Sequence, residues 1–177
     1  MNRAISLLAA IALVLAASGS TQANGSHGVA VHAVQGAGDG IVNLTTTAGQ
    51  TGFSAEITVN VHGMIPGTVL YVERAPEVGR PLGHDGNCQR ADGQWPWEQP
   101  SSLGFPPAPA FVPFPRPLVG PLETLTASDD GAGALHFAFD LPFIADGTQF
   151  DVEFRLVDSL TNPSIELRSD CFTVTVK

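Results

Sequence analysis

The chain has 177 residues, of which 44% are hydrophobic, and 17 acidic against 8 basic residues give it a net charge of −9. This acidic balance argues against nucleic acid and anionic membrane surfaces as partners, because both attract basic proteins. Once a leader is removed, the length predicts a single domain with its own core and is too short to predict two.

Residues 1–23 have the organisation of a secretory signal peptide. Arg3 supplies a positive charge, residues 4–17 are an apolar run, and residues 21–23 place small side chains where a signal peptidase reads them. The apolar run is shorter than the roughly 20 residues that span a bilayer, and no later segment approaches that length. We therefore expect a secreted or periplasmic mature domain over 24–177 with no membrane span.

Four strands are expected in the first half of the chain. Residues 29–34 alternate in polarity, and residues 41–47 are rich in β-branched side chains. Residues 53–61 are apolar at every odd position and polar at every even one, which is the period of a half-buried strand. The Ile-Pro-Gly-Thr that follows predicts a type II turn, because proline fixes φ at the first central position and glycine supplies the positive φ of the second. Because the chain then returns as a strand within the stretch that ends at Arg74, this predicts a β-hairpin.

Residues 75–121 differ in composition from the segments on either side, because they are rich in proline and glycine. Proline lacks the amide donor of a strand ladder and restrains the residue before it, so we expect an irregular loop without regular strands. Aromatic residues in this loop, Trp95 and Trp97 among them, argue against disorder because they can bury apolar surface. Cys88 in the loop and Cys171 near the C-terminus are the two cysteines of an exported chain, so we expect a disulfide between them.

The second half is expected to hold further strands at 122–128, 135–141, 150–156 and 171–177, with a short strand or extended segment at 164–169, which gives eight or nine strands in all. The alternation is clearest at 150–156, where four apolar residues face one side and Asp151, Glu153 and Arg155 face the other. No segment shows the periodicity of an amphipathic helix. The spacing of the strands predicts an all-β fold, an antiparallel sandwich or barrel.

Two short motifs resemble parts of immunoglobulin-like domains. Val59-x-Val61-x-Gly63-Met64-x-Pro66-Gly67-Thr68-x-Leu70-Tyr71 is similar to the strand, turn and Tyr-bearing strand of fibronectin-III-like domains. Thr126-x-x-Asp129-Asp130-Gly131-x-Gly133-x-Leu135 resembles turns of bacterial immunoglobulin-like and enediyne-apoprotein-like sandwiches. The resemblance implies an antiparallel immunoglobulin-like β-sandwich of about eight strands with a long Pro-rich loop, and it implies no activity. The chain departs from that pattern because Cys88 lies in the long loop and not on an early core strand.

The polar residues form no recognisable catalytic or metal-binding motif. The histidines include no His-x-His pair and are expected at the surface or at strand edges: His27, His32, His62, His84 and His136. Asp129 and Asp130 lack the alternating acidic ligands of a calcium loop and are expected to form a solvated turn. We expect no enzyme activity, no metal and no cofactor. His84, in a glycine-containing turn beside Cys88, is retained as a candidate ligand-binding residue.

The loop at 75–121 provides the functional hypotheses. Trp95 and Trp97, separated by one proline, are predicted to form an aromatic platform for a carbohydrate or for an extracellular protein. Alternatively the stiff loop presents an extended segment to a partner, or its aromatic residues cover an open edge of the sandwich. We expect a secreted, non-enzymatic binding or structural module. The alternative is an exported enzyme or metal-binding protein that uses His84 and neighbouring acidic residues.

Overall fold

The structure is a computed structural model that describes residues 25–49, 52–80, 82–94, 109–114, 122–141 and 144–176. The predicted signal peptide, Trp95 and Trp97 lie outside the described residues. The described part contains strands and turns and no helix, and so no helix that could cross a membrane. Its ten strands are β1 (Gly25–Gln35), β2 (Asp39–Gly49), β3 (Gly52–His62), β4 (Val69–Pro76), β5 (Val112–Pro113), β6 (Thr124–Thr126), β7 (Gly133–Leu141), β8 (Gln149–Val157), β9 (Glu166–Ser169) and β10 (Phe172–Thr175).

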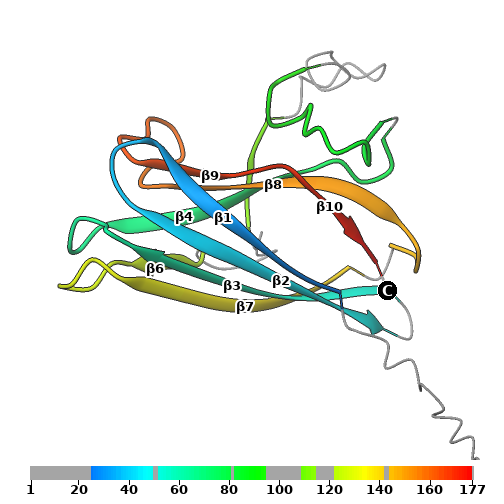
Figure 1. Ribbon diagram of the computed structural model, residues 1–177, viewed down its shortest axis with the longest axis horizontal. Helices are drawn as coiled ribbons and strands as arrows, with labels where there is room; N and C mark the ends of the chain where they lie inside the picture. Colours follow the sequence, from blue (N-terminus) through cyan, green and yellow to red (C-terminus); the bar gives the residue numbers. More distant parts are fainter. Residues whose placement is uncertain are drawn as a thin grey trace, which may run out of the picture.

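These strands form one antiparallel sheet that curls into a half-barrel (Figure 1). Their order is β5-β4-β8-β9-β1-β2-β3-β7, and in addition β10 pairs with β8 and β6 pairs with β4. In Figure 1, β8, β9 and β10 lie along the top and β3 and β7 along the bottom, with β1 and β2 passing between them. The predicted all-β, antiparallel architecture is confirmed at this level. One end of the sheet is formed by β4 and β5 and the other by β7, and the two ends face each other across the curl.

The core fills the inside of the curl and draws side chains from both layers. From β3, the predicted inward residues Ala55, Ile57, Val59 and Val61 are at most 2% exposed. From β8, Phe150, Val152, Phe154 and Leu156 are at most 3% exposed, and both sets belong to one apolar cluster. Each of the Val, Leu, Ile and Phe side chains contributes about 1.5–3 kcal/mol when it leaves water. Alternation in the sequence therefore identified the inner face of both strands correctly.

The strands that flank Pro66 and Gly67 do not pair with each other, so the predicted β-hairpin is wrong. The turn itself is as predicted, because Gly67 has a φ of 77° and the Thr68 amide donates to the Ile65 carbonyl oxygen over 3.1 Å. However, β3 pairs with β2 and β7, whereas β4 pairs with β8, β6 and β5. The turn thus carries the chain from one layer to the other. Alternation reports which face of a strand is buried, and it does not report the strand's partner.

The predicted irregular loop at 75–121 includes more regular structure than its prolines suggested. β4 continues to Pro76, and β5 adds a two-residue strand to the edge of β4. Pro113 fits there because an edge strand needs hydrogen bonds on one side only. We call residues 77–114 the anchored excursion, which is described over 77–80, 82–94 and 109–114.

Candidate functional site

The outer face of β8 carries charged side chains that are buried. Asp151, Glu153 and Arg155 alternate with the core residues of β8, as the sequence predicted. An antiparallel strand with such a pattern ordinarily shows its polar face to water. Here Asp151 is fully buried and Glu153 is only 8% exposed. The burial follows from the anchored excursion, because the Asp151 amide donates to the Gly83 carbonyl oxygen over 2.6 Å and thereby joins β8 to the excursion.

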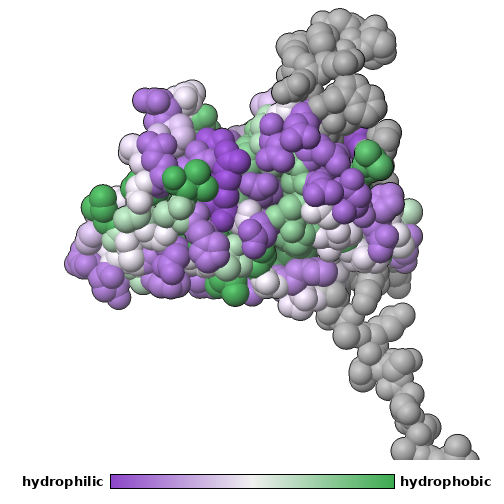
Figure 2. All heavy atoms as spheres, turned by 45° about the horizontal axis from the view of Figure 1, so that its top comes forward, coloured by the Kyte–Doolittle hydropathy of each residue, from purple (hydrophilic) through white to green (hydrophobic). Residues whose placement is uncertain are grey.

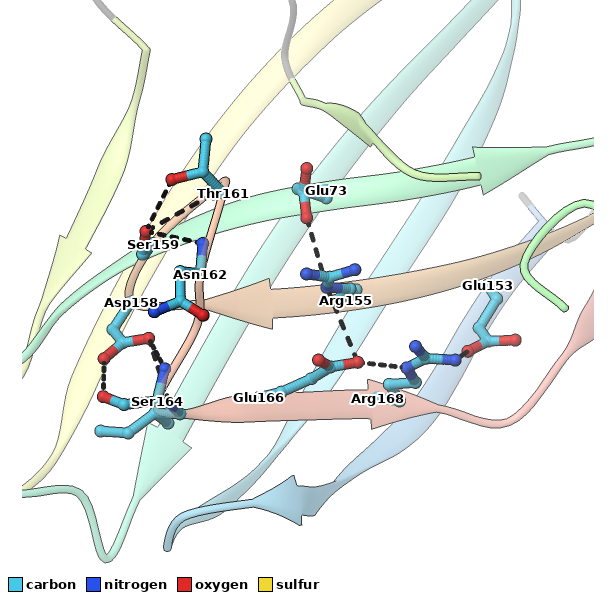
Figure 3. A network of polar contacts seen from close by, with 11 residues as sticks. Glu73, Glu153, Arg155, Asp158, Ser159, Thr161, Asn162, Ser164, Glu166 and Arg168 are labelled. Carbon is cyan, nitrogen blue, oxygen red and sulfur yellow. Dashed lines mark hydrogen bonds and ion pairs between the residues drawn. The ribbon is translucent and has the colours of Figure 1, made fainter. Parts of the chain in front are cut away.

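Five of the charged residues on this outer face form what we call the covered charge cluster (Figure 3). Arg155 Nε lies 3.3 Å from Glu73 Oε2 and 3.7 Å from Glu166 Oε1. Arg168 Nε lies 2.5 Å from Glu166 Oε1, and Arg168 Nη1 lies 3.8 Å from Glu153 Oε1. The strand register produces this arrangement, because Arg155 is the cross-strand partner of Glu73 on β4 and of Arg168 on β9.

Burial shifts the titration of the carboxyl groups in this cluster. Burial raises the pKa of Glu153 to about 7, against the opposing effect of Arg168, and Asp92, Asp170 and Glu166 add to the rise. Burial also raises the pKa of Glu73, where Arg155 opposes the shift and Glu166 reinforces it. Glu73 and Glu153 therefore resist ionisation although arginines lie beside them.

Phe111, on the returning arm of the anchored excursion, covers two arginines of the cluster. Its side chain is 6% exposed, and its ring centroid lies 5.2 Å from Arg155 Cζ and 5.0 Å from Arg168 Cζ. Cation–π contacts of this kind contribute about 0.5–2 kcal/mol each, and more when water is excluded. The cluster is therefore held between the sheet and the returning arm. In Figure 2, which turns the top of Figure 1 forward, hydrophilic side chains predominate on this side of the molecule and hydrophobic ones are scattered.

A covalent bond fixes the outgoing arm of the anchored excursion. Cys88 and Cys171, the pair expected from the sequence, form a disulfide in the structure with their Cα atoms 5.6 Å apart. The two cysteines are 83 residues apart, and closing a loop of that length stabilises the fold by about 4 kcal/mol in the chain-entropy account. Around the disulfide lies a second apolar cluster, separate from the main core, built from Ala75, Cys88, Ala91 and Phe111.

Buried carboxylates provide further anchors for the same arm. Glu77 is 1% exposed, and its Oε1 accepts the Arg90 backbone amide over 2.6 Å. Asp151 Oδ2 accepts the Gly86 amide over 2.8 Å, and Asp151 Oδ1 accepts the Thr173 hydroxyl over 2.5 Å. Burial raises the pKa of Glu77, although the hydrogen bond from the Arg90 amide opposes that rise.

The Arg90 side chain joins the two arms of the anchored excursion to each other. Its Nε donates to the Ala110 carbonyl oxygen over 3.0 Å, and its Nη1 donates to the Pro76 carbonyl oxygen over 3.1 Å. Ala110 belongs to the returning arm, while Pro76 ends β4. Hydrogen bonds from a charged donor are worth about 1.5–3 kcal/mol each, so one side chain holds both arms at the sheet.

Asp158 fixes the connection between β8 and β9 beside the cluster (Figure 3). Its carboxylate accepts the backbone amides of Ser164 at 2.8 Å and Ile165 at 3.0 Å, together with the Ser164 hydroxyl. Burial acts to raise the pKa of Asp158, but the hydrogen bonds from Ser164 and Ile165 outweigh it and hold that pKa below its usual value. The loop thus sets the register in which β9 presents Glu166 and Arg168 to β8.

Of the residues predicted from the sequence as site residues, the structure brings together Cys88 and Cys171. His84 is exposed, and Trp95 and Trp97 lie outside the described residues. Within the described ranges, no group of three or more His, Cys, Asp or Glu side chains is placed to hold a metal ion. The charged residues of β4 and β9 were missed. The available signal was the spacing of charges two apart at 151–155 and 166–168, which places them on one face of each strand.

Comparison of this chain with models of protein families, with curated proteins and with solved structures finds no match. The chemistry of the site is therefore read from its geometry. Arginines engage the three carboxylates of the covered charge cluster. Because Phe111 lies over both arginines, this arrangement suits holding the excursion on the sheet more than it suits attack on a substrate.

Proposed function

We propose that this protein is a secreted, non-enzymatic binding module with an immunoglobulin-like sandwich frame, and that the anchored excursion is its binding surface. The observation that carries the proposal is that both arms of the excursion are fixed to the sheet, the outgoing arm over the outer face of β8 and the returning arm at the edge of β4. The outgoing arm is held by the disulfide at Cys88 and by Glu77, and the returning arm by β5 and Phe111. The two facing layers of the curled sheet support the sandwich frame.

Rigid attachment favours a role in recognition. Association costs about 0.5–1.5 kcal/mol for each side chain that becomes immobilised, so a segment whose two ends are already fixed loses less on binding. Between these ends the sequence places Trp95 and Trp97, the two tryptophans of the chain. Aromatic rings carry much of the binding energy in protein interfaces and also supply flat surfaces for stacking. We therefore propose an extracellular carbohydrate or protein as the partner.

The covalent chemistry supports a compartment outside the cytoplasm. A disulfide that closes a long loop persists in oxidising surroundings and is rare in the cytosol. Together with the apolar leader of residues 4–17, the pair Cys88 and Cys171 supports export to the periplasm or to the cell exterior. An acidic, disulfide-bonded domain of this kind suits a protein that works outside the cell without binding nucleic acid.

The proposal is tested with the mature protein, residues 24–177, and a Trp95→Ala/Trp97→Ala double variant. Both are screened on a glycan array and on an array of secreted and cell-surface proteins. Because these are the two tryptophans of the chain, quenching of intrinsic fluorescence by acrylamide measures their exposure directly. We expect exposed rings, and binding that weakens at least about tenfold in the double variant.

His136→Ala is the matched control, since His136 is exposed on β7, on the face of that strand opposite to Phe137 and Phe139. It should bind as the unmodified protein does. The proposal fails if the double variant binds a captured partner as tightly as the unmodified protein, or if acrylamide cannot reach either ring.

A further inference from the structure

Glu153 lies on the outer face of β8, where the outgoing arm of the anchored excursion covers the sheet. Its cross-strand partner on β4 is Ala75, which belongs to the apolar cluster around the disulfide together with Ala91 and Phe111. Ala91 is 7% exposed and lies on the outgoing arm, a short way beyond Cys88. Glu153, which is 8% exposed, is therefore buried next to an apolar cluster that the excursion itself completes.

Most of the charged groups that act on Glu153 have its own sign. Arg168 on β9 faces it, with Nη1 3.8 Å from Glu153 Oε1, and the same guanidinium group pairs through Nε with Glu166 (Figure 3). Asp92 on the outgoing arm and Asp170 beside the disulfide oppose the ionisation of Glu153, as Glu166 does. The remaining charged residues on this face are Glu73 on β4 and Asp151 and Arg155 on β8.

The segment of the outgoing arm beyond Cys88 is attached to the sheet by a small set of contacts. Arg90 bonds to Glu77 Oε1 through its amide and to the Pro76 carbonyl oxygen through its side chain, and Ala91 packs in the apolar cluster. The sheet below is held by its own strand ladders. This segment can therefore open while the sheet stays folded and while the disulfide keeps the arm tethered, as in other local openings of folded proteins.

We propose that Glu153 is a pH-sensitive switch for the outgoing arm, which closes over β8 when the Glu153 carboxyl group is protonated and opens beyond Cys88 more often when that group is ionised. An ionised carboxylate in this place is removed from water and shares one arginine with Glu166. Opening returns it to water and moves Asp92 away from it. Because the pKa of Glu153 is about 7 in the closed form, the arm is held at acidic pH and loosens as the pH rises through 7.

The switch has a consequence for recognition. If the excursion is the binding surface proposed above, opening of its outgoing arm weakens binding at alkaline pH, because the partner must then order the arm again. That consequence rests on the proposed function. The switch itself is tested on the protein alone, so its failure and the failure of the proposed function are distinguishable.

Native-state hydrogen exchange of the 15N-labelled mature protein at about pH 5.5 and about pH 8 is the test. The reporters are the amides of Asp92 and Gln94, which donate to the carbonyl oxygens of Cys88 over 3.2 Å and of Gln89 over 2.8 Å, acceptors that do not titrate. After correction for intrinsic exchange rates, we expect their opening constant to rise about tenfold between the two pH values. The rise should be absent in Glu153→Gln, and urea below about 1 M should leave the opening constant unchanged.

Glu56→Gln is the matched control, since Glu56 is an exposed carboxyl group on β3, and this variant should keep the tenfold rise. The proposal is overturned if the opening constant is the same at both pH values or if Glu153→Gln keeps the rise. It is also overturned if exchange at Asp92 and Gln94 depends on urea as steeply as exchange at Phe154 does, because no separate opening then exists. A Glu153→Gln variant that does not fold would show that the closed form needs the ionised group, which contradicts the proposal.

Discussion

The two faces of β8 are both buried, and they are buried by different means. On the inner face Phe154 and its neighbours lie in an apolar core, where stability grows with the area removed from water. On the outer face the anchored excursion buries Asp151 and Glu153 and half-buries Arg155, and the stability of this face depends on ion pairs and hydrogen bonds between the charged side chains and their partners. One alternating strand can therefore place apolar side chains in the core on one face and charged side chains that hold the excursion on the other.

Truncation of the inner face should have the largest effect. Phe154 is 1% exposed and contacts Phe114 and Phe172 through its ring, so Phe154→Ala is expected to lower the free energy of unfolding by about 3–5 kcal/mol. Urea denaturation of the mature protein measures this. Val34→Ala, at a position 64% exposed, is the control and should change stability by less than about 0.5 kcal/mol. Equal losses in the two variants would contradict the assignment of the core.

Removal of the disulfide tests the covering of the outer face. The Cys88→Ala/Cys171→Ala variant should lose about 2–4 kcal/mol of stability, because its unfolded chain is no longer cross-linked. Limited proteolysis should then cleave the excursion before the sheet, since one anchor of the outgoing arm is gone. If the variant resists protease as well as the native protein does, the disulfide is not what holds this arm.

Single and double changes in the covered charge cluster distinguish pairing from packing. Arg155→Met leaves Glu73 and Glu166 without their shared cation, and we expect a loss of about 2 kcal/mol. The double variant Glu73→Leu/Arg155→Met removes both members of one pair and should be more stable than Arg155→Met alone. Urea denaturation of the native protein, Glu73→Leu, Arg155→Met and the double variant completes a thermodynamic cycle. A double variant that is less stable than Arg155→Met would show that Glu73 stabilises the fold through contacts other than this pair, and would contradict the expectation.

The smallest effect expected is a pH dependence due to Glu153. Its pKa is about 7 in the folded protein against an ordinary value of 4.5, so the folded state binds more protons between these two values. Its contribution therefore lowers stability as the pH rises from about 4.5 to 7, and the penalty persists above pH 7. Glu153→Gln should remove this slope and gain about 1–2 kcal/mol at pH 8, after allowance for partial screening. Parallel stability–pH curves for the variant and the native protein would contradict the assignment.

Local patterns in the sequence predicted local structure well and long-range structure poorly. The alternation at 53–61 and 150–156 identified both strands and their inner faces, because burial of one face imposes a period of two. The partner of β3 could not be predicted in the same way. The Pro66-Gly67 turn predicted a hairpin, yet the chain crosses to the other layer there, and only the assembled sheet decides the pairing.

The covered charge cluster could not be predicted from the sequence for a related reason. Glu73, Glu153 and Glu166 are far apart in the sequence and meet only through the strand register. Their burial depends on where the excursion lies on the sheet. The composition of residues 75–121 predicted only an irregular loop and not its position. Pairing of Cys88 with Cys171 could be expected from the number of cysteines and from the predicted signal peptide. The face of the sheet that the disulfide-linked arm covers could not be predicted, because it depends on how the strands assemble.

Hydrogen exchange at single residues tests most directly that the anchored excursion is fixed on the outer face of β8. The amides of Gly86 and Arg90 donate to Asp151 and Glu77, so they should exchange slowly, with protection comparable to that of the Phe154 amide in β8. Exchange of Gly86 and Arg90 at the rate of an unstructured peptide, while Phe154 stays protected, would contradict the account.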